Sequence, residues 1–175
     1  MGGSILRRGS ARWLTATALF MGMNIILSMS VFSIPVPGGH LYFCDAVINT
    51  AAVLLDPLAA FAVGGIGSFL GDFFFYPAPM FVSLAAHGLQ AVLVSVISHR
   101  LRAKNKALSA AMAMAAGAVV MVAGYSLGRA FVYSTPAYAI LKLPFEIAQA
   151  VFGAAVSVIL LYPLRLKETF ERISR

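Results

Sequence analysis

The amino-acid sequence predicts an all-α integral membrane protein, a compact bundle of about six transmembrane helices with both termini in the cytoplasm. Of its 175 residues, 61% are hydrophobic and only 11% are charged. Soluble domains carry about 25% charged residues, so this chain has too few polar side chains to cover a soluble fold of its size. Its basic residues also cluster in short segments between long apolar runs, which is typical of membrane topology rather than of a nucleic-acid-binding face.

Six apolar segments follow one another along the chain, and each is expected to span the membrane because a transmembrane helix needs about 20 apolar residues. Turn-forming prolines and glycines separate them, and Pro144 is expected in the first turn of the last span, where its missing N–H costs little. The second segment is short for a full crossing, and a longer connection is expected over 128–142. The whole chain, residues 1–175, is one domain with predicted spans at 13–32, 42–55, 58–75, 81–98, 108–127 and 143–162, and a cytoplasmic tail at 163–175.

The distribution of basic residues predicts the orientation. With six spans, the N-terminal segment, the connection after the fourth span and the tail lie on one side of the membrane. These three segments hold 11 of the 13 basic residues, and only Arg129 and Lys142 fall on the other side. Cytoplasmic segments carry the excess of Lys and Arg in membrane proteins. Both termini are therefore expected in the cytoplasm.

The scarce polar residues inside the spans gather in the outer half of the membrane. Ionisable groups at membrane depth are costly and usually serve function or pair with one another. Glu146 and Gln149 share one helix face because they are three residues apart. The candidate binding residues of this kind are Asp45, Asp72, His87, Gln90, Arg129, Glu146 and Gln149. The alternative is purely structural pairing, for example of Asp72 with Arg129.

Aromatic residues show the same outward bias. Tyr42, Tyr76 and Tyr125 join the candidate site, since a pocket lined by aromatic rings and a few convergent polar groups suits a small planar polar ligand. The alternative for the aromatic residues is an interfacial belt at the membrane surface.

No pattern in the sequence favours catalysis. There is no nucleophile elbow and no phosphate-binding Gly-x-x-x-x-Gly-Lys loop, so the chain is not expected to hydrolyse ATP. The single cysteine, Cys44, excludes an intrachain disulfide and a cysteine-rich metal site. We therefore expect no catalytic residues, no metal site, no cofactor and no nucleic-acid partner.

Small residues on the first span suggest a helix-docking surface. Ala18 and Gly22 have the small-xxx-small spacing that lets another helix approach closely. The alternative is packing against a helix of the same chain.

Three blocks of the sequence together resemble a known family. The first span contains Ala16-Thr17-Ala18-Leu19-Phe20-Met21-Gly22, and a second block runs from Asp45-Ala46-Val47 to Leu55-Asp56-Pro57-Leu58. The third block is the glycine-rich run Gly64-Gly65-Ile66-Gly67, which leads to Gly71-Asp72. With the chain length and six spans, these blocks are similar to the substrate-binding S components of energy-coupling factor (ECF) vitamin transporters, over residues 12–165. Asp56-Pro57 departs from the Gly-Pro turn that many S components have.

The resemblance implies a vitamin-binding subunit in a prokaryotic plasma membrane, crossing it several times. It would capture its substrate from outside and dock with a membrane T component and two cytoplasmic ATPases. Ala18 and Gly22 would contact the T component. The first outer loop, 33–41, would form a lid over the site with Pro37, Gly38, Gly39 and His40.

Acidic and amide groups with His87 favour a pyridoxine- or hydroxymethylpyrimidine-like heteroaromatic ligand. Folate or pantothenate would require more cationic contacts than Arg129 and Lys142 supply. Riboflavin and queuosine-type precursors remain open. A different class of function, a membrane scaffold or assembly protein whose polar groups only pair structurally, also fits the sequence.

Overall fold

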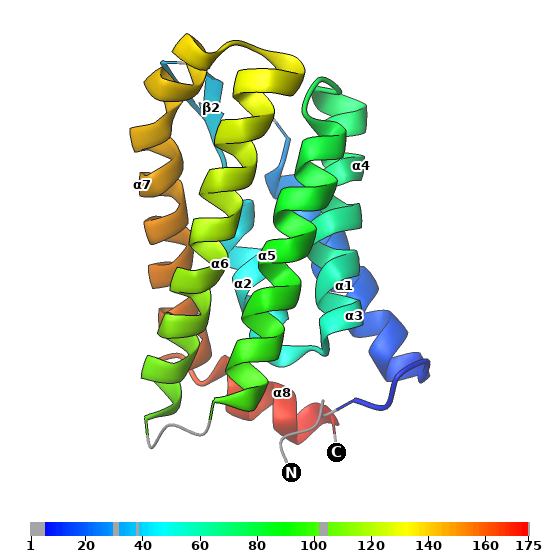
Figure 1. The fold of residues 1–175 in the computed structure, drawn as a ribbon. Helices are drawn as coiled ribbons and strands as arrows, with labels where there is room; N and C mark the ends of the chain where they lie inside the picture. The colour runs from blue at the N-terminus through cyan, green and yellow to red at the C-terminus, as the bar shows by residue number, and fades with distance from the viewer. Residues whose placement is uncertain (1–5, 30–31, 38, 102–104, 175) are drawn as a thin grey trace.

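The computed structural model describes residues 6–29, 32–37, 39–101 and 105–174, and over these residues the chain is mostly helical (Figure 1). The strands found there form a short antiparallel hairpin, β1 (Ile34–Val36) and β2 (Gly39–Leu41), in which Ile34 pairs with Leu41. Gly38, which was expected to hinge the lid, lies outside the described residues.

The helices follow the apolar segments of the sequence. Three consecutive elements, α3, η2 and α4, form one helix with a π-helical turn in its middle. The π-helical turn η3 follows α6 without a break and ends that helix. The bounds are α1 (Ala11–Leu27), α2 (Cys44–Leu54), α3 (Pro57–Phe61), η2 (Ala62–Ile66), α4 (Gly67–Phe75), α5 (Met80–Arg100), α6 (Lys106–Gly128), η3 (Arg129–Tyr133), α7 (Pro136–Leu161) and α8 (Leu166–Ser174).

Four of the described helical stretches are long and apolar enough to cross a membrane: 57–75, 80–100, 106–133 and 136–161. The two others among the expected spans are shorter. Helix α1 has 17 residues and α2 has 11, so at 1.5 Å per residue they are about 25 and 17 Å long. The hydrocarbon core of a bilayer is about 30 Å thick.

The start of α7 differs from the sequence expectation. The helix begins at Pro136 and not at residue 143, so Pro144 lies inside it instead of in its first turn. The Thr135 side chain caps the helix by accepting from the Tyr138 backbone N–H at 3.4 Å, and a proline at the first helical position suits this start. Much of the connection expected at 128–142 is therefore helical.

The two ends of the bundle carry different structures (Figure 1). At one end the Arg12 side chain donates to the Ser174 carbonyl, and the Tyr162 hydroxyl donates to the Lys106 carbonyl. This end therefore brings together the start of α1, the start of α6 and helix α8. Burial against the bundle, with the nearby Lys106, lowers the pKa of Lys167 in α8, although Glu171 opposes this shift. The β1–β2 hairpin lies at the opposite end.

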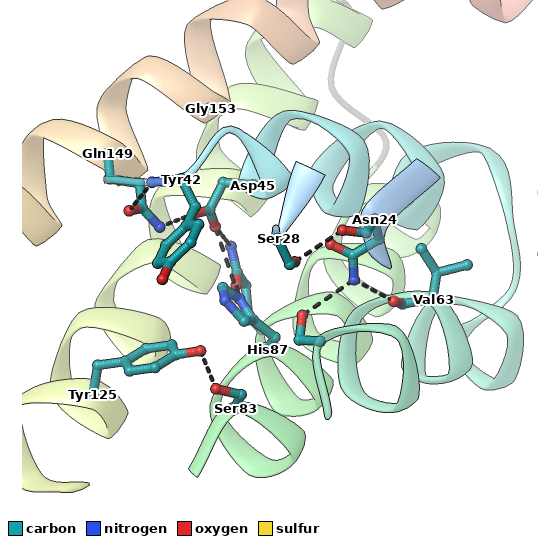
Figure 2. Close-up of polar contacts among 12 residues, drawn as sticks. Asn24, Ser28, Tyr42, Asp45, Val63, Ser83, His87, Tyr125, Gln149 and Gly153 are labelled. Carbon is teal, nitrogen blue, oxygen red and sulfur yellow. Dashed lines mark hydrogen bonds and ion pairs between the residues drawn. The ribbon is translucent and has the colours of Figure 1, made fainter. Parts of the chain in front are cut away.

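Helix α2 is the centre of the bundle, since every residue from Cys44 to Leu54 is buried. A close approach between α2 and α7 depends on Gly153, where an added Cβ would lie 3.1 Å from the Asp45 backbone carbon and 3.2 Å from the Ala46 nitrogen. Helix α1 is joined to the π-helical turn by Asn24, whose amide donates to the Val63 carbonyl at 2.7 Å (Figure 2). The π turn redirects that carbonyl, and a neighbouring side chain satisfies it.

Candidate binding site

A cavity of about 320 Å³ opens at the hairpin end of the bundle. Residues from β2, α2, α4, α5, α6, η3 and α7, and from the connections after α1, β2 and α4, line it. Nearly every part of the chain therefore contributes to one cavity. The lining residues are Ser28, Gly39, His40, Tyr42, Cys44, Ser68, Asp72, Phe75, Tyr76, Pro79, His87, Met121, Tyr125, Arg129, Tyr133, Lys142, Glu146 and Gln149.

Aromatic rings form one part of the wall. Tyr42, Phe75, Tyr76, Tyr125 and Tyr133 reach the cavity from five different elements or connections. The Tyr125 ring meets the His87 ring edge to face, with the centroids 5.1 Å apart. Rings at these positions offer flat apolar surfaces to a planar ligand.

A short hydrogen-bond chain fixes Asp72 on α4. The Ser83 hydroxyl donates to Asp72 Oδ2. The Tyr125 hydroxyl donates to Ser83 Oγ at 2.5 Å, as Figure 2 shows. Ser83 is fully buried. The chain connects α4, α5 and α6 and leaves the Asp72 carboxyl at the cavity wall.

A largely buried ion pair joins the start of η3 to α7. Arg129 donates through Nη2 to Glu146 Oε1 at 2.9 Å, and Ser126 Oγ donates to Glu146 Oε2 at 3.3 Å. The Arg129 guanidinium also lies over the Tyr133 ring, 5.3 Å from its centroid. Glu146 and Arg129 therefore compensate each other's charge within the cavity wall.

Helix α7 holds the hairpin over the cavity. Lys142 Nζ donates to the His40 carbonyl, and the Tyr42 backbone N–H donates to Gln149 Oε1 at 2.9 Å. Residues 142, 146 and 149 lie on one face of α7, because they are spaced by four and three residues. The hairpin and the residue that follows it are thus tied to α7 at two points, with the ion pair between them.

A network of amides surrounds Asp45 behind the cavity wall (Figure 2). Gln90 Nε2 donates to Asp45 Oδ1 at 2.8 Å, and Gln149 Nε2 donates to Asp45 Oδ2 at 2.7 Å. Gln90 Oε1 in turn lies 2.7 Å from His87 Nδ1. The Asp45 side chain is 1% exposed, so a buried carboxylate is stabilised here by two N–H donors.

The structure brings together the residues that the sequence singled out. Eight of them line the cavity: Tyr42, Asp72, Tyr76, His87, Tyr125, Arg129, Glu146 and Gln149. Asp45 and Gln90 lie behind the wall, where Asp45 accepts from Gln149 and Gln90 faces His87. In the expected lid, Gly39 and His40 line the cavity, whereas Pro37 lies in the turn after β1 and is not among the lining residues.

Several lining residues were not predicted from the sequence. Lys142 was detectable, because it shares the face of α7 with Glu146 and Gln149. Ser28, Ser68, Cys44 and Met121 gave no signal, since each is a common small or apolar residue within an apolar segment.

Cys44, Asp45 and His87 have potential metal-ligand atoms within 4.8 Å of one another. Both Asp45 oxygens already accept from amides, and His87 Nδ1 faces Gln90. A metal ion would have to break these hydrogen bonds, so the arrangement fits a closed polar network better than a metal centre.

The outer face of α1 carries the small residues of the predicted docking surface. Ala18 is exposed, and a Cβ added to Gly22 would meet nothing within 4 Å. By contrast, a Cβ on Gly67 would lie 2.7 Å from the Asn24 side chain. The Ala18 and Gly22 face is therefore open in this chain.

Comparison with known proteins gives two matches. The family model of the ECF-type riboflavin transporter S component matches residues 9–166. A protein of Pyrococcus woesei, described as an uncharacterized protein in gap 3'region, is 32% identical over 134 residues, which cover 75% of this chain and 88% of that protein.

Proposed function

The chain belongs to the family of ECF-type riboflavin transporter S components, and on that premise we propose that it captures a neutral heteroaromatic vitamin in the hairpin-end cavity. Members of this family are substrate-specific subunits of vitamin transporters, which work with a membrane T component and ATPases. The finer assignments below, of ligand, orientation and docking surface, are proposals.

The proposal rests on one observation: the two cationic side chains at the cavity already have hydrogen-bonding partners within the protein. Arg129 is paired with Glu146, and Lys142 donates to the His40 carbonyl. An anionic vitamin would have to compete with these partners for both cations. A neutral ring with N–H, O–H and ring-nitrogen groups instead matches the carboxyl, amide and imidazole groups at the wall.

Two ligand types fit this description. Pyridoxine- or hydroxymethylpyrimidine-like compounds present hydroxyl or amine groups on a small ring, which suits the compact cluster of polar groups around His87. Riboflavin is the second candidate, and the description of the matching family favours it. Its larger ring system would use more of the aromatic wall.

Ligand identification tests the proposal. The protein is purified in detergent, denatured, and the released small molecules are identified by mass spectrometry; ligand-free protein is then titrated with pyridoxine, hydroxymethylpyrimidine and riboflavin. We expect tight binding of one of these three compounds. Failure of all three to bind, or tight binding of an anionic vitamin instead, would contradict the proposed ligand class.

The orientation that we propose places six membrane-spanning segments with both termini in the cytoplasm. It is supported by Arg8, Arg12 and Lys106, which lie at the same end of the bundle as helix α8. The cavity would then face outward. Single cysteines in a Cys44→Ser background test this: a cysteine at Thr169 should react with a membrane-impermeant maleimide only in opened cells, and one at Ala137 should react in intact cells.

The open face at Ala18 and Gly22 is proposed to receive the T component. Small residues allow close helix approach in a membrane, where packing and not water exclusion drives association. The absence of any neighbouring atom near a Gly22 Cβ supports this use over packing within the chain.

A further inference from the structure

The directions of the hydrogen bonds around Asp45, that is, which atoms donate and which accept, determine which nitrogen of His87 carries a proton. Each member of the network has a neighbour whose role is fixed, so the roles can be followed from the Tyr42 backbone to the imidazole ring. A backbone N–H is always a donor, and an ionised carboxylate is always an acceptor.

The assignment of donors and acceptors begins at Tyr42, which follows the hairpin. Since the Tyr42 N–H donates, the Gln149 atom facing it must be the oxygen, and the Gln149 nitrogen must face Asp45. On the other side, Gln90 donates its nitrogen to Asp45, so its oxygen faces His87 Nδ1. The Tyr42 N–H sets the orientation of the Gln149 amide, and with Asp45 as the carboxylate its Oδ1 sets the orientation of the Gln90 amide.

An amide oxygen only accepts, and therefore His87 Nδ1 must carry the proton. His87 is 3% exposed and its Nδ1 lies 3.9 Å from the nearest Asp45 oxygen. Both Asp45 oxygens already have amide donors, so the carboxylate is stabilised without an imidazolium. A neutral ring protonated at Nδ1 leaves a lone pair on Nε2.

We propose that His87 is held as the neutral Nδ1–H tautomer and presents Nε2 to the cavity as a hydrogen-bond acceptor for an N–H or O–H group of the ligand. This inference deepens the proposed function, because it rests on the vitamin occupying the cavity that His87 lines. It assigns a positioning role to Asp45, Gln90 and Gln149, which act on the ligand through His87. It also makes a ligand donor group a requirement for binding.

The tautomer is tested by nitrogen NMR in ligand-free protein. The chain has three histidines, so a His40→Gln/His99→Gln variant labelled with ¹⁵N-histidine reports only on His87. We expect a pyrrole-type Nδ1 and a pyridine-type Nε2. A protonated Nε2, whether in the other neutral tautomer or in an imidazolium, would overturn the assignment.

The role of the amide relay is tested with Gln90→Met, which removes the acceptor from Nδ1 but keeps a side chain of similar length. We expect the ring to shift measurably toward the Nε2–H tautomer in this variant. The control variant Tyr125→Phe keeps the aromatic ring against His87 and removes only a hydroxyl that donates to Ser83, so it should retain the Nδ1–H form. An unchanged tautomer in Gln90→Met would show that Gln90 does not set it.

The contact with ligand is tested by titrating the labelled protein with riboflavin and with pyridoxine. A ligand donor on Nε2 should shift the pyridine-type resonance toward the pyrrole-type range. Binding that leaves this resonance unmoved would overturn the acceptor role of His87. If neither these vitamins nor hydroxymethylpyrimidine binds, the proposed ligand class fails, whereas the tautomer measured without ligand still stands or falls on its own.

Discussion

Gln149 Nε2 donates to Asp45 Oδ2 at 2.7 Å, and this contact joins two residues that are 104 positions apart in the sequence. It connects α7 to α2, the most buried helix, and the other end of the same amide accepts from the Tyr42 backbone. A single side chain therefore ties the residue that follows the β1–β2 hairpin to the centre of the bundle. The wall of the cavity depends on this connection.

Asp45→Asn is expected to destabilise the protein and weaken ligand binding. A carboxamide offers one acceptor oxygen to two amide donors, so an N–H group must face another N–H group. An unsatisfied buried group of this kind costs about 1–3 kcal/mol, equivalent to a loss of affinity of roughly fivefold to 150-fold if it appears in binding. Thermal unfolding in detergent and vitamin titration measure the two effects. Wild-type values in both would mean that the amide network does not form.

Gly153→Ala is expected to separate α7 from α2. The added methyl group would overlap Asp45 Cβ and crowd the Asp45 and Ala46 backbone, and overpacking of a well-packed core costs about 1–3 kcal/mol. Gly22→Ala is the matched control, because its Cβ would meet nothing within 4 Å. We expect a clear fall in the unfolding temperature for Gly153→Ala and no fall for Gly22→Ala. Equal behaviour of the two variants would contradict the close helix contact.

Glu146→Gln is expected to weaken ligand binding while leaving membrane insertion unchanged. The substitution leaves Arg129 in the cavity wall without its charged partner, and breaking a buried ion pair costs about 3–5 kcal/mol. Glu168→Gln is a suitable control, because the Arg165–Glu168 pair on α8 is exposed, with a separation of 3.9 Å. Vitamin titration of membranes with equal protein content compares the two. Unchanged affinity in Glu146→Gln would remove Glu146 from the site.

Asp56→Ala is expected to cost more stability than Arg8→Ala, although the two residues form one ion pair of 2.5 Å. Asp56 also caps α3 by accepting from the Ala59 N–H at 2.9 Å, and loss of an N-cap costs about 1 kcal/mol. The Arg8 side chain is 61% exposed, so the ion pair itself contributes only about 0–1 kcal/mol. Unfolding temperatures of both variants give the ranking. A larger loss for Arg8→Ala would show that the ion pair, and not the cap, dominates.

Replacing Ala18 and Gly22 together with tryptophan is expected to spare vitamin binding but abolish ATP-driven uptake. Large side chains on this face would prevent close approach of a partner helix. Val119→Trp is the control, because Val119 is 70% exposed on α6, on a different helix. Binding is measured on purified protein and uptake in cells that contain the T component and ATPases. If uptake survived the double substitution, the docking surface would lie elsewhere.

Much of the lining of the cavity was predictable because membrane depth makes polar residues conspicuous. Eight of the ten substrate-site candidates line the cavity, and the spacing of Glu146 and Gln149 on one helix face needed no tertiary information. Partners were harder to predict. The sequence suggested Asp72 with Arg129 as an example of structural pairing, whereas Arg129 pairs with Glu146 and Asp72 accepts from Ser83.

The positions of helices and strands were also only partly predictable from the sequence. Proline ended or began helices where expected at Pro57, but Pro144 lies inside α7 because Thr135 and Pro136 start that helix earlier. The hairpin at 34–41 replaced an expected loop. Whether a proline starts a helix or lies inside it depends on the residues before it. The short strands are held by a neighbouring helix, since Lys142 of α7 donates to the His40 carbonyl.

The sequence by itself determined the membrane character and the concentration of polar groups toward one end, because hydropathy and charge act through the solvent that surrounds each segment. Only the tertiary structure decided that Asp45 and Gln90 stand behind the cavity wall while His87 faces it. That distinction depends on which amide meets which carboxylate across α2, α5 and α7, and hydrogen-bond direction is fixed only when the helices are packed.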